Sequence, residues 1–513
     1  MIQNITRTLR ILSILYTYEI DQLIFPKILR LSYFTHWLVP KEIKTMTRDV
    51  RCFHACIQLG PLFVKLGQLV SIRQDLFPDD ITNTLTQLQD KTPPADFQAI
   101  QTQIESALNK SIDQVFSQIN PIPIGSASIA QAHAAQLNNG KSVVIKVLKP
   151  NIKKEIKRDL KLLNFLCRFI KHKAIAKTLL HEYELTLMHE LNLYQEASHY
   201  SQMRHNFSQD ERIYIPYVYW QYSATNIIVL EHIKASKLAD VLSNPEVCKK
   251  ELAYTGIQLL FEQVFEHRFF HADMHPGNLF FDTTNPNKPK YILIDFGIIG
   301  ILSPNDQYYL AECFLAFYHR DYTRIAQLHV DAQWVSPNAN IIQLEHALRG
   351  VCEPLLTLPL QEISIAHLMH EIITTCKKFD LNIQPQLLML QKTLFHTESI
   401  SRKLYPELNI WQAAAPYIKS FMKKRVSIQS GWHHMKHELP RIFSQSPEIP
   451  RLLHAHLKQK PPATTKTRSS SLFILGVTVG CTLSLTTQLT IPIGAYIITH
   501  TIIIMILLRQ WKV

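Results

Sequence analysis

Cysteine is scarce in this sequence, and the few cysteines are not arranged in pairs. The eight are scattered along the chain: Cys52, Cys56, Cys167, Cys248, Cys313, Cys352, Cys376 and Cys481. The first two lie one helical turn apart, but no second pair completes a structural zinc site. We therefore expect reduced thiols inside a cytosolic domain.

Glycine is also scarce, with 13 in 513 residues, and charged residues make up only 19%. The net charge of +13 still fits three kinds of partner: a nucleic acid, an anionic membrane or an acidic ligand such as a nucleotide. Because the positive residues are not interleaved with aromatic residues in a known reader motif, we expect no nucleic-acid partner. The lysine-rich stretch 149–177 is either a solvated helix face or a contact for anionic lipid headgroups.

Near the C-terminus, charged residues are missing altogether. No Asp, Glu, Lys or Arg occurs between Ser469 and Leu508. One helix of that length would be about 60 Å long, roughly twice the hydrocarbon core of a bilayer. The pattern therefore predicts two membrane-spanning helices, near 471–488 and 491–508, with a buried soluble hairpin as the alternative. Lysine and arginine flank both ends of the pair, which predicts that both ends lie in the cytoplasm.

The rest of the sequence predicts an α+β protein of several domains. Helical spacing covers 36–115, 151–205, 249–268 and 304–425. Strand patterns occur at 124–137, 141–148, 226–233, 279–281 and 291–295, and the first two are joined by an Asn-Asn-Gly turn. No signal peptide is expected. Residues 1–35 are expected to be helical, either packed on the protein or lying on a membrane.

Four sequence pieces follow one another in an order that suits phosphoryl transfer. The first is a loop of small residues whose backbone amides can approach phosphates. The second is Lys146, which ends the apolar strand segment VVIK, where its ammonium can reach the α- and β-phosphates. The candidate ATP-binding residues of the loop are Ile124, Gly125, Ser126, Ala127, Ser128, Ile129, Ala130, Gln131 and Ala132.

The third piece is HADMHPGN (271–278), in which Asp273 precedes Asn278 by five positions, as in a kinase catalytic loop. Asp273 is the candidate base that takes a proton from an attacking hydroxyl or water, and Asn278 is a candidate Mg²⁺ ligand. The fourth piece is Asp-Phe-Gly, 17 residues after Asn278, with Asp295 as a second Mg²⁺ ligand. Together the four pieces predict a kinase-like site for Mg²⁺ and ATP.

Two further features belong to the predicted site. Lys146 needs a carboxylate partner, and Glu190 and Glu196 both lie on a helix that follows the strand; we favour Glu190. Glu231 and Ile233 end a later strand, where a kinase hinge would bind adenine through backbone groups.

Histidine-rich segments leave two alternatives open. The HxDxH pattern at 271–275 also suits a transition-metal site, because imidazole and carboxylate bind zinc or iron. The histidines of 432–438 form either a metal site or a solvated cluster. The DFG segment that follows at 295–297 favours the kinase interpretation of the first pattern.

These motifs resemble those of the UbiB family of atypical, protein-kinase-like proteins over nearly the whole chain. VKLGQLVSIRQDLFPDDI (64–81) is similar to the family's K-x-G-Q segment, here Lys65, Gly67 and Gln68, which ordinary protein kinases lack. IGSASIAQAH resembles the family's alanine-rich loop. ELNLYQEA, FFHADMHPGNLFF, LIDFGIIG and LQKTLFHTE (390–398) also resemble family signatures.

Two positions depart from the family pattern. Gly125 stands where many relatives have alanine, which makes the loop more like that of a protein kinase. Asn192 stands where some relatives have aspartate, so no metal role is assigned to it.

The resemblance implies a two-lobed kinase-like core with ATP and Mg²⁺ as cofactors. It also implies that Lys65 and Gln68 enter the pocket and obstruct a protein substrate, with Lys65 paired to Glu196. The implied domains are a helical extension at 1–115, the lobes at 116–233 and 234–425, a basic linker at 426–470 and two transmembrane helices at 471–508.

The family is linked to ubiquinone biosynthesis and its membrane-bound enzymes. The implied partners are membrane lipid, ubiquinone intermediates and other proteins of that pathway. The implied location is the bacterial inner membrane, with the kinase-like domain in the cytoplasm.

Three functions fit these observations. The first is an ATPase or kinase of a small or lipidic substrate that serves ubiquinone synthesis. The second is a conventional Ser/Thr protein kinase, against which the K-x-G-Q segment, the scarcity of glycine in the loop and the lack of an Ala-Pro-Glu segment argue. The third is a non-catalytic, lipid-binding scaffold whose nucleotide only switches its shape.

Overall fold

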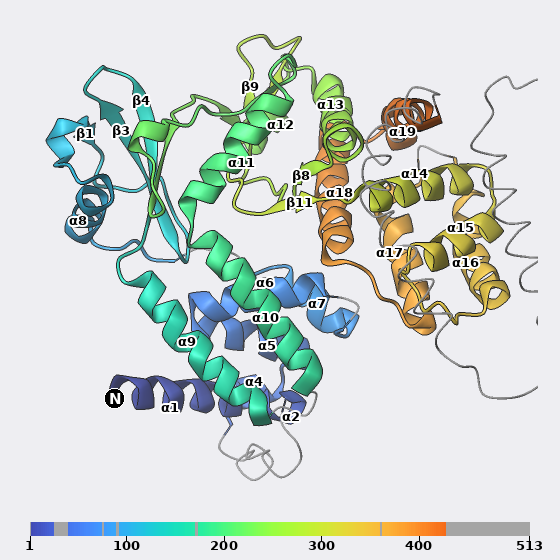
Figure 1. The fold of residues 1–513 in the computed structure, drawn as a ribbon, viewed down its shortest axis with the longest axis horizontal. Coiled ribbons are helices and arrows are strands. Elements are labelled where there is room, and N and C mark those ends of the chain that lie inside the picture. Colours follow the sequence, from blue (N-terminus) through green and yellow to red (C-terminus); the bar gives the residue numbers. More distant parts are fainter. Residues whose placement is uncertain are drawn as a thin grey trace, which may run out of the picture. The chain divides into compact units, whose positions relative to one another are not determined.

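The computed structural model describes residues 2–24, 39–73, 76–88, 92–169, 173–359 and 362–426. Figure 1 shows how helices and short strands alternate along these ranges. The predicted membrane hairpin, nearly all of the predicted linker and the histidine cluster at 432–438 lie outside the described residues. Within the described ranges, no helix is both long and apolar enough to cross a bilayer.

The N-terminal part is helical, as its sequence pattern predicts. Gly60, with φ of +101°, lets the chain reverse between two of these helices, a backbone conformation that favours glycine. The helices are α1 (Ile2–Thr17), α2 (Asp21–Ile24), α4 (Lys41–Lys44), α5 (Arg48–Leu59), α6 (Pro61–Ile72), α7 (Asp79–Leu85) and α8 (Phe97–Leu108), followed by the 3-10 turn η3 (Ile112–Gln114).

Gly67 lies where α6 packs against its neighbours. A Cβ at this position would come within 2.4 Å of Leu88 Cδ1 and 3.2 Å of Cys56 Sγ. Cys56 lies on α5, and Leu88 follows α7. The space is filled by a small apolar cluster that includes Val64, Ile81 and Leu88. Glycine at this position therefore serves close helix packing.

We expect Gly67→Val to destabilise this helical region by about 1–3 kcal/mol, because a branched side chain overpacks a filled contact. Gly125→Val is the matched control, since a Cβ at Gly125 meets no atom within 4 Å. The measurement is the thermal unfolding midpoint together with amide hydrogen exchange in α5, α6 and α7. Equal exchange in both variants would contradict the packing role.

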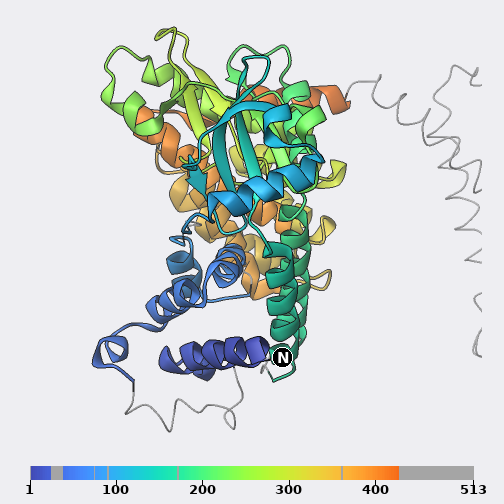
Figure 2. The same cartoon turned by 90° about the vertical axis from the view of Figure 1, so that its left-hand side faces the viewer.

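A five-stranded antiparallel sheet follows, in the order β1-β3-β4-β6 with β2 paired to β3. The predicted turn at 138–140 joins β3 to β4, and Gly140 has the expected positive φ of +83°. Helix α8 packs on one face of the sheet, against the alternate apolar residues of β4 (Figure 2). The strands are β1 (Phe116–Ile119), β2 (Gly125–Ser126), β3 (Ala130–Leu137), β4 (Ser142–Leu148) and β6 (Ile227–Glu231).

The register of this sheet decides which residues face the site. Ala132 pairs directly with Lys146, so their side chains share one face. Ile145 and Val147 point to the other face, where α8 covers them. Lys146 is thus held on the face opposite α8.

Helices connect this sheet to the rest of the fold. Figure 1 shows α9 and α10 running side by side along the N-terminal helices, and α11 continuing toward the second group of strands. The elements are α9 (Ile152–Leu166), η4 (Cys167–Phe169), α10 (Lys173–Glu190), α11 (Leu193–Asn206), β5 (Ile213–Tyr214) and η5 (Trp220–Tyr222).

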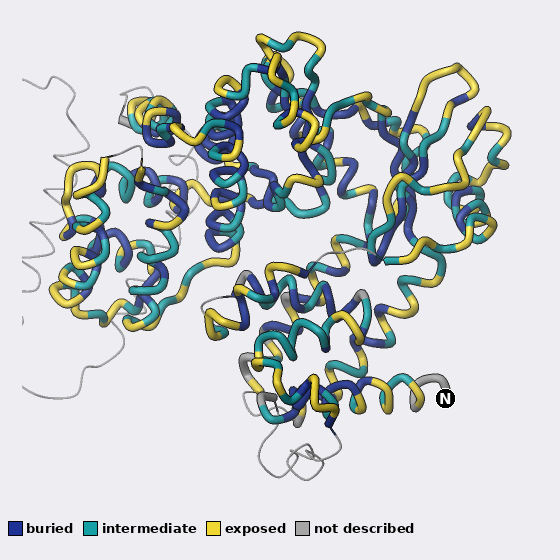
Figure 3. Tube along the Cα trace, turned by 180° about the vertical axis from the view of Figure 1, so that it is seen from behind, coloured by how far each residue is buried: buried dark blue, intermediate teal, exposed yellow. Residues whose placement is uncertain are grey.

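The second group of strands forms two small sheets, β5-β10-β9-β7 and β11-β8. Helices α13 and α18 hold mostly buried positions and pack together behind them (Figure 3). The strands are β7 (Ser236–Lys237), β8 (Phe269–His271), β9 (Leu279–Asp282), β10 (Lys290–Leu293) and β11 (Ile299–Ile301). The helices are α12 (Leu238–Ser243), α13 (Lys249–Glu262) with the π-turn η6 (Gln263–His267), α14 (Pro304–Tyr318), α15 (Tyr322–Asp331), α16 (Ile341–Leu355), α17 (Ile365–Cys376) with η7 (Lys377–Phe379), α18 (Pro385–Leu404) and α19 (Ile410–Val426).

The α+β class and the placement of the strand segments are confirmed. Each predicted strand segment overlaps an observed strand, and 304–425 is mostly helical. The seven cysteines in the described ranges form no disulfide.

Candidate functional site

Lys146, Glu196 and Asp295 meet in the interior between the five-stranded sheet and the second group of strands. Lys146 Nζ donates to Glu196 Oε1 at 2.7 Å and to Asp295 Oδ1 at 3.0 Å. The preference for Glu190 as the partner of Lys146 is therefore wrong. Glu196 lies on α11, which crosses beside β6, whereas Glu190 ends α10 before the chain turns at Leu191–Asn192.

The electrostatics of this triad hold the lysine charged. Burial by itself lowers the pKa of Lys146, but Asp295 and Glu196 raise it more strongly, so the pKa lies well above its usual value. Burial raises the pKa of Glu196 to about 7, against the opposing pull of Lys146. Burial also raises the pKa of Asp295, yet the ammonium groups of Lys146 and then Lys65 bring it far below its usual range.

Helix α11 also holds the Asp-Phe-Gly segment. Tyr200, one turn after Glu196, accepts a hydrogen bond of 2.7 Å from the Asp295 backbone amide. His199 Nδ1 lies 2.9 Å from the Phe296 carbonyl oxygen, and the buried Phe296 ring packs edge-on against Tyr200. Sequence reasoning did not identify Tyr200 and His199, although their helical spacing from Glu196 was a signal.

Asp295 adopts a left-handed backbone conformation, with φ of +62°. Few residues other than glycine, asparagine and aspartate adopt this conformation readily. The bend turns the carboxylate toward Lys146 while the Phe296 side chain enters the core.

Lys65 of the K-x-G-Q segment has a different partner from the one expected. Its Nζ lies 3.0 Å from the carboxylate of Glu190, so the pairing with Glu196 implied by the family resemblance is wrong here. The ammonium is still close enough to lower the pKa of Asp295. Lys65 therefore lies at the border of the site and acts on Asp295 through its charge.

Gln68 and Gly67 make contacts within the N-terminal helical part. Gln68 Nε2 donates to the Leu88 carbonyl oxygen at 3.0 Å. Gly67 provides the close contact with Leu88 described above. The expectation that the Gln68 amide enters the pocket is not met, because Leu88 engages it.

The loop of small residues at 124–132 is held from outside by the segment that precedes α8. Thr92 Oγ1 donates to the Ala127 carbonyl oxygen at 2.6 Å, and the Thr92 amide donates to the Ser126 carbonyl oxygen at 3.3 Å. Lys149 Nζ in turn donates to Thr92 Oγ1 at 2.6 Å. These bonds fix the loop through its carbonyl groups. The amides of Ile124 and Ala127 are used within the loop, where they donate to the Ala132 and Ala130 carbonyl oxygens.

One predicted loop residue points away from the nucleotide face. The Gln131 side chain accepts from the Ala95 amide at 2.8 Å, and its Nε2 lies 2.9 Å from His133 Nε2. Because residues alternate along β3, Gln131 lies on the face that α8 covers, opposite Ala132. Its side chain is therefore engaged away from the nucleotide face, and the binding role of residue 131 stays a prediction for its backbone.

The catalytic-loop motif is organised around His271. The Asp273 amide donates to His271 Nδ1 at 3.1 Å, so His271 Nε2 carries the proton and donates to the Ile294 carbonyl oxygen at 3.0 Å. Burial lowers the pKa of His271, which fits this neutral tautomer. Both ring nitrogens are thus engaged, which argues against the transition-metal interpretation of HxDxH. Among the described residues no group of His, Cys, Asp and Glu is arranged to hold a metal.

Asn278 and Asp295 lie at the same end of paired strands. Strands β9 and β10 pair Leu279 with Leu293, and the Ile294 amide donates to the Asn278 carbonyl oxygen at 3.1 Å. The Asn278 side-chain nitrogen donates to the Asp273 carbonyl oxygen, so its side-chain oxygen is the atom left for a cation. A carboxylate and an amide oxygen are hard ligands, and this donor set fits Mg²⁺.

Lys392 is a site residue that sequence reasoning missed. It lies on α18, and its Nζ is 3.3 Å from Asp273 Oδ1. Burial raises the pKa of Asp273, but Lys392 and then His275 lower it more, so the net shift is downward. His396 follows one turn later, and burial followed by Lys392 lowers its pKa to about 4. The only sequence signal was the LQKTLFHTE segment (390–398).

We expect Lys392→Gln to move the acid limb of the pH–rate profile to higher pH. Asp273 acts as a base only when ionised, and losing a nearby cation raises its pKa. The measurement is the rate of ATP turnover across pH. Lys403→Gln, an exposed position on the same helix, is the control and should leave the profile unchanged. Coincident profiles for all three proteins would exclude a role of Lys392 in setting the charge of Asp273.

At the predicted hinge, the Glu231 side chain makes hydrogen bonds within the protein. Glu231 Oε2 accepts hydrogen bonds from Tyr214 Oη at 2.7 Å and from the Tyr217 amide at 3.1 Å. The Glu231 carboxylate is therefore occupied, and only backbone groups of Glu231 and Ile233 remain as adenine-binding candidates. That role stays a prediction.

Comparison with known proteins gives matches along most of the chain. Residues 87–329 match the ABC1 atypical kinase-like domain, and residues 348–409 match the UbiB helical domain. A protein named "Probable protein kinase UbiB" from Marinobacter nauticus is 42% identical over 422 residues, which cover 81% of this chain and 77% of that protein. A protein of the same name from Pseudomonas fluorescens is 39% identical over 484 residues, or 90% of each chain.

A solved structure also aligns with the chain. It is the complex of Rv3197 with erythromycin from Mycobacterium tuberculosis. The alignment covers 68% of this chain and 90% of that chain, with a TM-score of 0.48 and 20% sequence identity. The kinase-like character predicted from the four motifs is confirmed by the domain match over 87–329.

Proposed function

Because the chain belongs to the UbiB family of atypical kinases, we propose that it is a Mg²⁺- and ATP-dependent enzyme that supports ubiquinone biosynthesis at the bacterial inner membrane. The observation that carries the proposal is the convergence of Lys146, Asp295, Asn278 and Asp273. These four residues come from three segments, since Asp273 and Asn278 share one loop, and each has the chemistry that phosphoryl transfer requires.

Each residue has a distinct role in this proposal. Lys146, kept charged by Glu196, binds the α- and β-phosphates. Asp295 and Asn278 hold Mg²⁺, which when bound neutralises charge on the phosphates. Asp273 takes the proton from the attacking hydroxyl or water, and Lys392 keeps its carboxylate ionised.

The acceptor is proposed to be water or a small or lipidic substrate. The N-terminal helices support this view, because Lys65 borders the site and Thr92 holds the phosphate loop from outside. The uncharged stretch 469–508 supports location at a membrane, close to hydrophobic ubiquinone intermediates and the enzymes that process them.

The test is the ubiquinone content of cells whose only copy carries Asp273→Asn, measured by mass spectrometry at normal protein level. We expect ubiquinone to collapse, because the proposed base is lost. If ubiquinone stays normal while deletion of the gene lowers it, the protein is a scaffold and the site is dispensable. If deletion also leaves it normal, the quinone assignment is wrong.

A further inference from the structure

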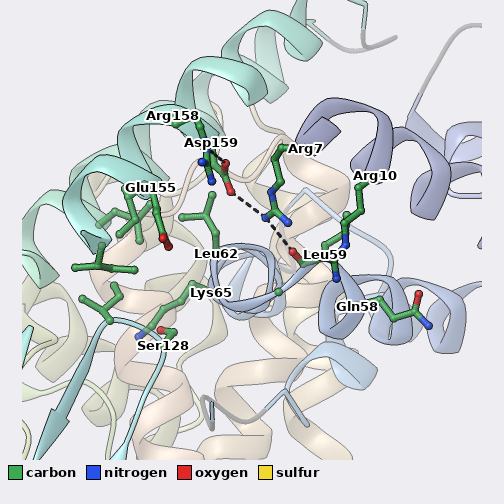
Figure 4. A pocket seen from close by; sticks show the side chains of 15 residues that line it. Arg7, Arg10, Gln58, Leu59, Leu62, Lys65, Ser128, Glu155, Arg158 and Asp159 are labelled. Carbon is green, nitrogen blue, oxygen red and sulfur yellow. Dashed lines mark hydrogen bonds and ion pairs between the residues drawn. The ribbon is translucent and has the colours of Figure 1, made fainter. Parts of the chain in front are cut away.

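A cavity of about 420 Å³ lies beside the phosphate loop, on the side of the N-terminal helices. Its walls come from α1, the α5–α6 junction, α9, the end of α10 and loop residues Ser128 and Ile129 (Figure 4). Cavities of roughly 300–1,000 Å³ hold small molecules in other proteins. Of the residues that line it, only Lys65, Ser128 and Ile129 have a role assigned above, at the border of the nucleotide site.

One part of the cavity wall is apolar. Six aliphatic side chains from four separate segments contribute to it, and all but one are largely buried. An apolar chain placed here would be removed from water on several sides, which favours binding. The six residues are Leu59, Leu62, Ile129, Ile152, Ile156 and Leu187.

The polar part of the wall carries more positive than negative charge. Four cationic side chains, Arg7, Arg10, Lys65 and Arg158, face two acidic ones, Glu155 and Asp159. Asp159 is already engaged by Arg7 at 2.9 Å and by Arg158 at 3.3 Å. Lys65 is likewise paired with Glu190 at 3.0 Å, so an excess of one positive charge remains.

Two of the arginines keep unused hydrogen-bonding capacity. Arg7 donates to Asp159 and to the Leu59 carbonyl oxygen, but its buried Nε has no acceptor among the described residues. A buried donor without a partner is costly unless a ligand or water supplies the acceptor. Arg10 is exposed at the rim, and no ion pair or hydrogen bond joins its guanidinium to any described residue.

We propose that this cavity binds an anionic amphiphile, a molecule with a phosphate or carboxylate head and a short apolar chain. The guanidinium groups of Arg7 and Arg10 bind the head, and the aliphatic wall receives the chain. Arg7 and Arg10 disfavour a cationic head, whereas the carboxylate of Glu155 repels an anionic head that comes close to it. Ser128, Ile129 and Lys65 belong both to this wall and to the border of the nucleotide site. A ligand bound in the cavity therefore affects the conformation of the phosphate loop.

The test is photolabelling of the full chain in phosphatidylcholine nanodiscs without nucleotide. The probe is a six-carbon alkyl phosphate with a diazirine near the end of its chain, and labelled peptides are mapped by mass spectrometry. We expect labels in α1, in residues 58–65 and in the first turns of α9. Arg10→Gln should weaken labelling about tenfold, because a charge-assisted hydrogen bond is lost. Ile152→Trp should block the cavity.

Arg349→Gln, an exposed arginine on α16, is the matched control and should label like the wild type. Competition identifies the source of the natural ligand. Displacement by phosphatidylglycerol vesicles indicates a membrane lipid, whereas displacement only by soluble hexyl phosphate indicates a soluble metabolite. Labelling that hexanol displaces equally well, or that Arg10→Gln leaves unchanged, overturns the proposal. Since no nucleotide is present, the result is independent of whether the protein hydrolyses ATP.

Discussion

Replacing Asp295 by asparagine is expected to reduce Mg²⁺-dependent ATP turnover by about 100-fold or more. The substitution removes the negative charge that faces Lys146 and would hold the metal, and losing one such electrostatic group typically costs 10²–10³ in rate. Asparagine tolerates the left-handed backbone at this position, with φ of +62°, so the fold should persist. The measurement is phosphate release at saturating Mg²⁺ and ATP.

Asp380→Asn is a matched control for this experiment. Asp380 is also an aspartate with a left-handed backbone, with φ of +54°, but it lies at the end of η7 and is exposed. We expect turnover in this variant to equal that of the wild type. Unchanged turnover in Asp295→Asn would remove Asp295 from the metal site and with it the kinase-like mechanism.

The second large expected effect distinguishes Glu196 from Glu190, which the sequence alone could not do. Glu196→Gln should lower ATP turnover about 100-fold, because it removes the closest carboxylate from half-buried Lys146 and weakens the hold on the phosphate-binding ammonium. Glu190→Gln should cost less than about fivefold, because the carboxylate that it replaces pairs with Lys65 at the border of the site and not with Lys146.

The comparison of the two variants is the decisive result. Measuring nucleotide affinity together with the maximal rate shows whether the loss lies in binding or in turnover. A larger loss in Glu190→Gln than in Glu196→Gln would mean that Lys146 changes its partner when nucleotide binds. Equal losses would mean that Lys65 and Lys146 act as one unit.

The four chemical residues of the site followed from the sequence because their signals are local. DxxxxN at 273–278 and DFG at 295–297 each occupy a few consecutive positions, and the strand pattern ending at Lys146 is equally compact. The chemistry requires these residue types at these short spacings. Their positions in the structure follow from strand pairing of the flanking segments, which hydrophobic alternation also indicates.

Residues that meet across long separations could not be identified in this way. Lys392 lies 119 positions from Asp273, and it reaches the carboxylate only because α18 packs behind the second group of strands. Tyr200 reaches the Asp295 amide from 95 positions away. No local pattern encodes such contacts, since they depend on how whole helices are placed.

By itself the sequence determined the α+β class and the choice of Lys146, Asp273, Asn278 and Asp295 as candidate site residues. Only the tertiary structure decided the pairings around them. Glu190 and Glu196 both lie in one helical pattern, but a break at 191–192 separates α10 from α11 and sends the two carboxylates to different lysines. Ion pairs depend on distances of a few ångströms, and these are fixed by packing between elements rather than by periodicity within them.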